Sequence, residues 1–117
     1  MKLGHLELFV AEPHKAKEFY VNALGFELVA EQGESFAWVK SGGIEILLRP
    51  GAGQPKGNVY RSASSAIVLY CDDLLKTKQR LEENGVLFTG DDGGEDCPVF
   101  QDPDGNWFQL VNPEDMQ

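Results

Sequence analysis

An internal repeat is the feature that most constrains the fold of this 117-residue chain. His5 to Pro13 reads HLELFVAEP, and Ala66 to Leu74 reads AIVLYCDDL. In each segment, a short alternating strand runs directly into acidic residues that suit the start of a helix. The sequence therefore predicts two copies of one module, in which equivalent positions have equivalent structural roles. His5 and Ala66 are such a pair, and of the two only His5 can bind a metal or move a proton.

A helix is predicted after each opening strand. In the first copy, apolar residues recur at a helical period: Ala16, Phe19, Tyr20, Ala23 and Leu24. Pro13 suits a first helical position, and Gly25 suits the left-handed residue just past the helix end. In the second copy, Asp72 or Asp73 can cap the helix and Gly85 can close it.

Three strand-like segments follow each predicted helix. They span residues 26–32, 35–40 and 44–49 in the first copy, and 86–89, 98–101 and 106–112 in the second. The Asp102-Pro-Asp-Gly105 segment is a turn signal, because Pro presets φ and Gly tolerates positive φ. The order β-α-β-β-β, twice over, predicts an α+β fold. In this fold two βαβββ modules form a curved mixed sheet around a cleft, with the helices on the outside.

The length and the 42% hydrophobic content predict one domain over residues 1–117. Module one is expected at about residues 1–50, a linker at about 51–62 and module two at about 63–113. The linker prediction comes from Gly51 to Asn58, which holds three Gly and one Pro. Asp91 to Asp96 is predicted to be an acidic loop.

Charge and hydropathy exclude several classes of partner. The net charge of −9 argues against nucleic acid and against anionic membranes. The excess is uneven, because residues after 58 hold 4 basic and 12 acidic side chains. A cationic ligand would therefore be favoured near the second half. No apolar run reaches the roughly 18 residues of a membrane span, and the N-terminal segment lacks a basic region followed by an apolar stretch, so we expect a cytoplasmic protein.

The repeated module resembles the vicinal oxygen chelate superfamily, which includes glyoxalase I, bleomycin-resistance proteins, fosfomycin-resistance enzymes and extradiol dioxygenases. The resemblance covers nearly the whole chain and depends on several motifs taken together. These are His5, Phe19-Tyr20 followed by Leu24-Gly25-Phe26, Asp72-Asp73-Leu74, Asn84-Gly85-Val86, and Asp102-Pro-Asp-Gly-Asn106. The same scaffold supports unrelated chemistries, so the resemblance predicts the fold more specifically than the function.

The resemblance implies four metal-ligand positions, one on the first and one on the last strand of each module. They map to His5 and Ala66 on the first strands, and to Gln109 on the last strand of module two. Two registers are open for the last strand of module one: one places Glu45 at the ligand position, and the other places Ile46 there. We prefer Glu45, because alternation then turns Ile44, Ile46 and Leu48 toward the helices. If a divalent metal binds, its ligands would be His5, Glu45 and Gln109.

Aromatic and polar residues on the same strand faces predict a ligand site. The predicted ligand-binding residues are His5, Glu7, Phe9, Trp38, Glu45, Tyr70, Trp107 and Gln109. An aromatic, acidic cleft of this kind suits an aromatic or cationic organic ligand. Because two of the four family ligand positions have changed, we favour small-molecule binding or sequestration without a catalytic metal, similar to bleomycin-resistance proteins.

Two alternatives stay open at the level of sequence. One is a metal-dependent lyase, isomerase or dioxygenase of the glyoxalase type that uses His5, Glu45 and Gln109, with Glu7 as general base. The other is a non-enzymatic subunit that binds a protein partner through an exposed apolar patch. The resemblance also implies a homodimer, in which modules can be exchanged between chains.

Overall fold

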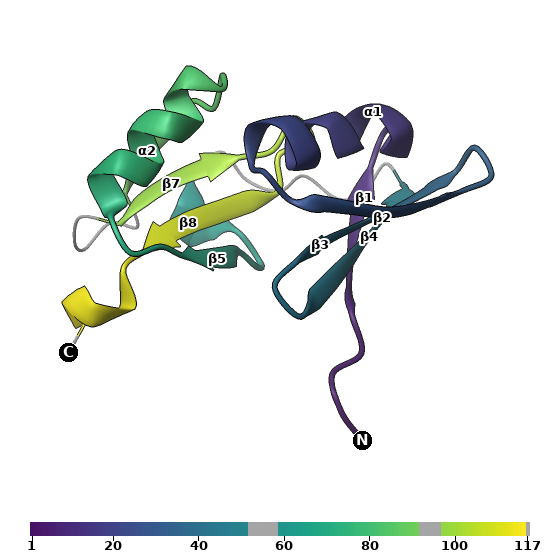
Figure 1. Cartoon of the computed structure of the whole chain (residues 1–117), viewed down its shortest axis with the longest axis horizontal. Coiled ribbons are helices and arrows are strands. Elements are labelled where there is room, and N and C mark those ends of the chain that lie inside the picture. The colour runs from purple at the N-terminus through teal and green to yellow at the C-terminus, as the bar shows by residue number, and fades with distance from the viewer. Residues whose placement is uncertain (52–58, 92–96, 117) are drawn as a thin grey trace. The chain divides into compact units, whose positions relative to one another are not determined.

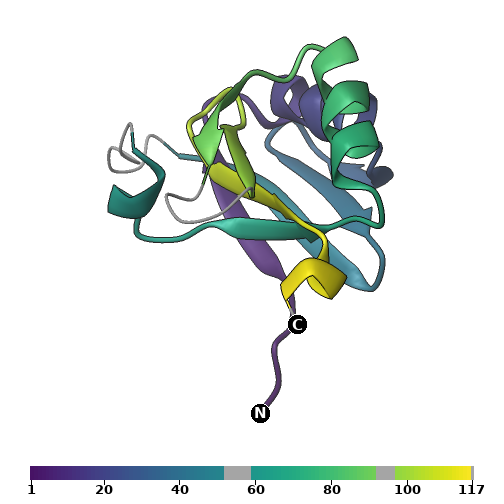
Figure 2. The same cartoon turned by 90° about the vertical axis from the view of Figure 1, so that its left-hand side faces the viewer.

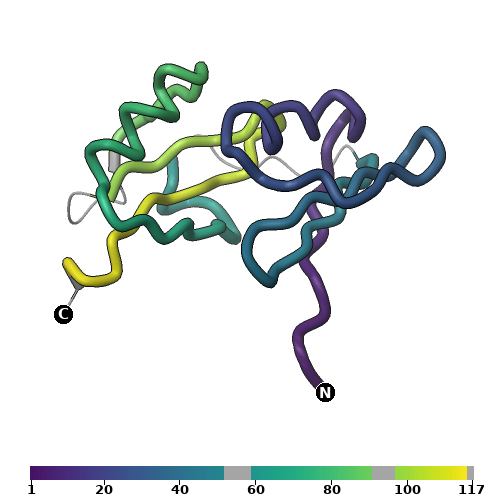
Figure 3. The backbone as a smooth tube through the Cα atoms, in the orientation of Figure 1, coloured from purple at the N-terminus to yellow at the C-terminus, as the bar shows by residue number. Residues whose placement is uncertain are grey.

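The structure is a computed structural model that describes residues 1–51, 59–91 and 97–116. It divides into two compact units, Met1–Gln54 and Pro55–Gln117. Residues 52–58 of the predicted linker lie outside the described residues, as do residues 92–96 of the predicted acidic loop. Figure 3 traces the chain through a strand, a helix and three further strands in each unit.

The first unit is a four-stranded mixed sheet with one helical segment. Its strands are arranged β1-β4-β3-β2, with β1 parallel to β4 and the other pairs antiparallel. Figure 1 shows α1 lying across one face of this sheet. In chain order the elements are β1 (Leu6–Val10), α1 (Pro13–Glu18), η1 (Phe19–Ala23), β2 (Glu27–Gln32), β3 (Phe36–Ser41) and β4 (Ile44–Pro50).

The second unit repeats this plan. Its strands are arranged β5-β8-β7-β6, with β5 parallel to β8 and the other pairs antiparallel. Figure 2 shows α2 alongside the second sheet from a direction turned by 90°. The elements are η2 (Tyr60–Ser62), β5 (Ile67–Tyr70), α2 (Leu74–Glu83), β6 (Phe88–Asp91), β7 (Pro98–Gln101), β8 (Trp107–Val111) and η3 (Pro113–Met116).

Two βαβββ-like modules with an α+β composition are therefore confirmed. The predicted helix signals are also present. Pro13 opens α1, and Asp73 caps α2 by accepting a hydrogen bond from the Lys76 backbone N–H at 3.1 Å. Gly25 and Gly85 follow the helices with φ of 79° and 96°, a region that glycine adopts without steric cost.

The structure corrects two local predictions. The first helix is not α-helical throughout, because residues from Phe19 to Ala23 form a π-helix in which the Leu24 N–H donates to the Phe19 carbonyl. In the second module, the strand predicted at residues 86–89 starts later, at Phe88. Val86 is buried just before it and is not part of the strand.

Each core lies between a sheet and its helix. In the first unit, buried side chains of one sheet face pack with Ala16 of α1 and Tyr20 of η1; those of the sheet are Val10, Ala37, Val39, Ile46 and Leu48. In the second unit, the rings of Phe100 and Phe108 stack with centroids 5.1 Å apart, and Leu81 of α2 is buried. No helix in the described part of the chain is long and apolar enough to cross a bilayer.

Alternation along β4 explains which side chains remain outside the core. Ile46 and Leu48 are buried, as predicted, but Ile44 is 53% exposed because it pairs with Ser41 at the hairpin end of the strand. Glu45, Leu47 and Arg49 occupy the opposite face of the sheet, where Leu47 is also buried.

Candidate functional site

The face of the first sheet opposite α1 gathers most of the predicted site residues. We call it the His5 face. The strand register and the alternation of side chains place one set of residues on it. From β1 outward they are His5, Glu7, Phe9, Glu45, Leu47, Arg49, Phe36, Trp38 and Lys40. The register pairs Leu6 with Ile46, so His5 and Glu45 occupy neighbouring positions one residue earlier on the two strands.

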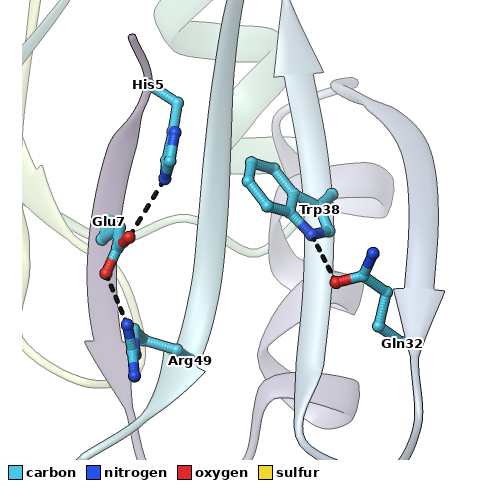
Figure 4. Close-up of polar contacts among 5 residues, drawn as sticks. All are labelled: His5, Glu7, Gln32, Trp38 and Arg49. Carbon is cyan, nitrogen blue, oxygen red and sulfur yellow. Dashed lines mark hydrogen bonds and ion pairs between the residues drawn. The ribbon is translucent and has the colours of Figure 1, made fainter.

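A chain of hydrogen bonds crosses the His5 face. Nε2 of His5 donates to Oε2 of Glu7 at 3.0 Å, and Nη1 of Arg49 donates to Oε1 of Glu7 at 2.9 Å. Figure 4 shows the carboxylate between its two partners. The hydrogen bond from Arg49, followed by that from His5, lowers the pKa of Glu7 below its ordinary value of 4.5. Glu7 is therefore an ionised acceptor at neutral pH.

Aromatic rings flank these hydrogen-bonded residues on both sides. The rings of His5 and Trp38 meet edge to face with centroids 4.8 Å apart. The Arg49 guanidinium lies 5.7 Å from the Phe9 ring centroid and 5.5 Å from that of Phe36, within cation–π range of both.

The Trp38 ring is also held by a polar contact at its indole nitrogen. Its Nε1 donates to Oε1 of Gln32 on β2 at 3.1 Å (Figure 4). The His5 ring and Gln32 thus fix both the position and the orientation of the indole. A ring held in this way loses little conformational freedom when a ligand packs against it.

A second cluster lies within the second unit. The register places Gln109, Trp107, Val68 and Tyr70 on the sheet face opposite α2, which we call the Gln109 face. The Tyr60 ring packs edge to face against Trp107 at 5.6 Å, and its hydroxyl donates to Oε1 of Gln109 at 3.4 Å. Gln109 and Trp107 are buried, whereas Tyr70 is 74% exposed. This cluster is aromatic and uncharged.

The predicted site residues thus fall into two groups, five in the first unit and three in the second. Contacts join His5, Glu7 and Trp38 directly, and Arg49 joins Glu7 to Phe9. Glu45 and Tyr70 are placed by strand register alone. The alternation used for Glu45 would also have placed Arg49 on the face, whereas Tyr60 lies in the segment predicted as linker and had no sequence signal.

The residues at the family's metal positions do not form a complete metal site. Ala66 supplies no donor atom. Glu7 engages Nε2 of His5, and the Tyr60 hydroxyl donates to Oε1 of Gln109, the atom that a metal would need. Among the residues that the structure describes, no group of three or more His, Cys, Asp or Glu side chains could hold a metal ion. We therefore derive no chemistry through a metal.

Comparison with known proteins identifies the family. The model of the Glyoxalase/Bleomycin resistance protein/Dioxygenase superfamily matches residues 2–110. The chain therefore belongs to this superfamily, whose members often use a divalent metal and bind small molecules.

Individual relatives agree with this assignment. The chain is 30% identical to the uncharacterized protein YetH of Bacillus subtilis, over 93% of this chain and 96% of the relative. A superfamily member from Sphaerobacter thermophilus has a similar structure, with a TM-score of 0.68, 30% identity and coverage of 96% and 98%. TnmS3, an antibiotic binding protein from Streptomyces sp. CB03234, superimposes with a TM-score of 0.69, 28% identity and the same coverage.

Proposed function

We propose that this protein binds and sequesters a flat aromatic small molecule, and that the ligand packs on the His5 face without the help of a catalytic metal. The observation that carries the proposal is the hydrogen-bonded chain from His5 through Glu7 to Arg49, bordered by three aromatic rings. Similarity to an antibiotic binding protein supports a binding role.

The geometry supports binding more than bond chemistry. Both oxygens of Glu7 already accept hydrogen bonds, so this carboxylate is poorly placed to act as a general base. The rings, by contrast, offer accessible apolar surface, since Phe9 is 44% exposed and Phe36 and Trp38 are partly exposed. A ligand ring that buries about 200 Å² of apolar surface gains about 5 kcal/mol, which corresponds to an affinity near 0.1–1 mM before polar contacts are added.

The binding test uses the Trp38 indole N–H as a local reporter in ¹H–¹⁵N correlation spectra. Titration with 2-naphthalenemethanol and 9-anthracenemethanol is expected to shift the Trp38 cross-peak saturably. Phe9→Ala should weaken binding about tenfold, because it removes one ring, equivalent to about 1.4 kcal/mol. Leu75→Ala is the matched control, since Leu75 is 80% exposed on α2 and lies on neither face.

Two results would contradict the proposed function. One is the absence of a saturable Trp38 shift with either compound. The other is stoichiometric, tightly held metal in protein purified without chelator, if His5→Ala abolishes it, because this would restore the metal-dependent alternative.

We also propose that residues 1–117 act as one domain in a cytoplasmic homodimer that binds neither nucleic acid nor membrane. The repeat, the acidic composition and the pairing known in the superfamily support this arrangement. Analytical ultracentrifugation should give a dimer at micromolar concentration, and a monomer there would contradict the proposal.

A further inference from the structure

Arg49 is held by several contacts, but its hydrogen-bond donors are not all paired. Nη1 donates to Glu7, and the guanidinium lies near the Phe9 and Phe36 rings. Its Nε is buried and has no hydrogen-bond partner. An arginine carries five N–H donors, and an unpaired buried donor on a charged group is costly enough to require an explanation.

Glu7, the acidic residue that lies between His5 and Arg49 on the His5 face, does not offer a free site for a cation. Glu7 accepts hydrogen bonds from both His5 and Arg49, so its charge is already matched. Glu45 lies opposite Lys40 in the strand register, which places a second pair of opposite charges side by side. Beside the Phe9 and Phe36 rings, the unused hydrogen-bonding capacity therefore belongs to a donor, the Arg49 guanidinium.

Arg49 is also accessible and preorganised. Its side chain is 40% exposed although Nε is buried, so a molecule on the face can reach the rest of the guanidinium but not Nε itself. The contacts with Glu7 and the two rings restrict a side chain that would otherwise lose considerable rotamer entropy on binding. A planar guanidinium next to aromatic rings is suited to a ligand whose own ring packs on the Phe side chains while an oxygen accepts from the N–H groups.

We propose that Arg49 is the specificity-determining residue of this face and that it selects aromatic ligands carrying an anionic oxygen, a carboxylate or a phenolate. The inference depends on the proposed function, because it names the chemical class of the ligand that binds there. The cationic ligand considered from the sequence is thereby replaced by an anionic one that Arg49 recognises.

The experiment compares three probes that share one ring system and differ in charge. They are 2-naphthoate, 2-naphthalenemethanol and 2-naphthylmethylammonium, titrated at pH 7 and low salt by calorimetry and by the Trp38 cross-peak. Naphthoate should bind at least about tenfold more tightly than the ammonium probe, because its carboxylate can accept charge-assisted hydrogen bonds from Arg49, which are stronger than neutral ones. In Arg49→Gln the ratio of naphthoate affinity to ammonium-probe affinity should fall below about threefold, while the affinity of 2-naphthalenemethanol should change by less than about threefold.

Lys40→Gln is the matched control variant, because it removes a positive charge from the same face without altering the guanidinium. It should leave the naphthoate preference intact. Glu7→Gln provides a second test that does not depend on Arg49→Gln folding well. It removes the charge that neutralises Arg49 and should raise naphthoate affinity about threefold or more.

Each contrary result has a distinct meaning. If the ammonium probe binds most tightly, or the preference survives in Arg49→Gln, the role of Arg49 is refuted while the aromatic binding function stands. If the preference disappears equally in Lys40→Gln, general charge attraction replaces specific recognition and the inference fails. If no probe shifts Trp38, the proposed function itself fails.

Discussion

Asp102 is predicted to hold the hairpin that places Trp107 and Gln109 in the second sheet. Its side chain is only 4% exposed, and its carboxylate accepts three hydrogen bonds within the loop that precedes β8. Oδ1 accepts from the backbone N–H groups of Asp104 at 2.9 Å and Asn106 at 2.8 Å, and Oδ2 accepts from Nδ2 of Asn106 at 2.8 Å.

The expected cost of Asp102→Ala follows from these three bonds. A buried donor left without its partner costs about 1–3 kcal/mol. Asp104 and Asn106 are half-buried, so water can reach some of the released donors, and we expect a loss of about 3 kcal/mol in the free energy of unfolding. Asp102→Asn retains the Oδ1 contacts and loses the one from Nδ2 of Asn106, so it should cost about 1 kcal/mol.

Urea denaturation followed by tryptophan fluorescence in a Trp38→Phe background tests this prediction. Trp107 is then the only tryptophan in the sequence, and it reports on the second unit. The dependence of the free energy on urea should keep its slope in both variants. A loss below about 1 kcal/mol for Asp102→Ala, or equal losses for the Ala and Asn variants, would refute the reasoning.

Three other predictions concern stability. The pKa of Glu7 is lowered in the folded protein, so its stabilising contribution is full above the unfolded value near 4.5 and is lost as pH falls through the folded pKa. The difference in unfolding free energy between wild type and Glu7→Gln, measured by urea denaturation, should therefore shrink below about pH 4.5. A constant difference down to about pH 3 would contradict this. Gly51→Ala should destabilise the first unit by about 1 kcal/mol, because the new Cβ would lie 2.7 Å from Cδ1 of Phe9, and an unchanged melting temperature would disprove it. Asp73→Ala should cost about 1 kcal/mol by removing the α2 cap, whereas Asp73→Asn should cost far less, and similar losses for both would argue against capping.

The fold could be predicted from local signals because the same order of strand, helix and three strands occurs twice along the chain. Pro13, Gly25, Asp73 and Gly85 mark helix ends through backbone constraints that depend on the residue itself. The π-helix at residues 19–23 could not be anticipated, because its apolar spacing also fits an α-helix. The late start of β6 likewise depends on pairing with β7 rather than on local propensity.

The candidate site was predictable only where strand alternation was enough. A period of two places His5, Glu7 and Phe9 on one face without knowledge of their neighbours. That Glu7 would be paired with Arg49 depends on the parallel register of β1 and β4, which brings residues 42 positions apart into contact. For this reason the sequence suggested an acidic face, whereas the contacts show a neutralised carboxylate and an incompletely paired arginine.

The most direct test of ligand binding on the His5 face is a single ¹H–¹⁵N titration of the wild-type protein with 2-naphthoate. We expect a saturable shift of the Trp38 indole cross-peak, since this N–H lies on the face and donates to Gln32. A titration that leaves the Trp38 cross-peak in place up to millimolar naphthoate would contradict it.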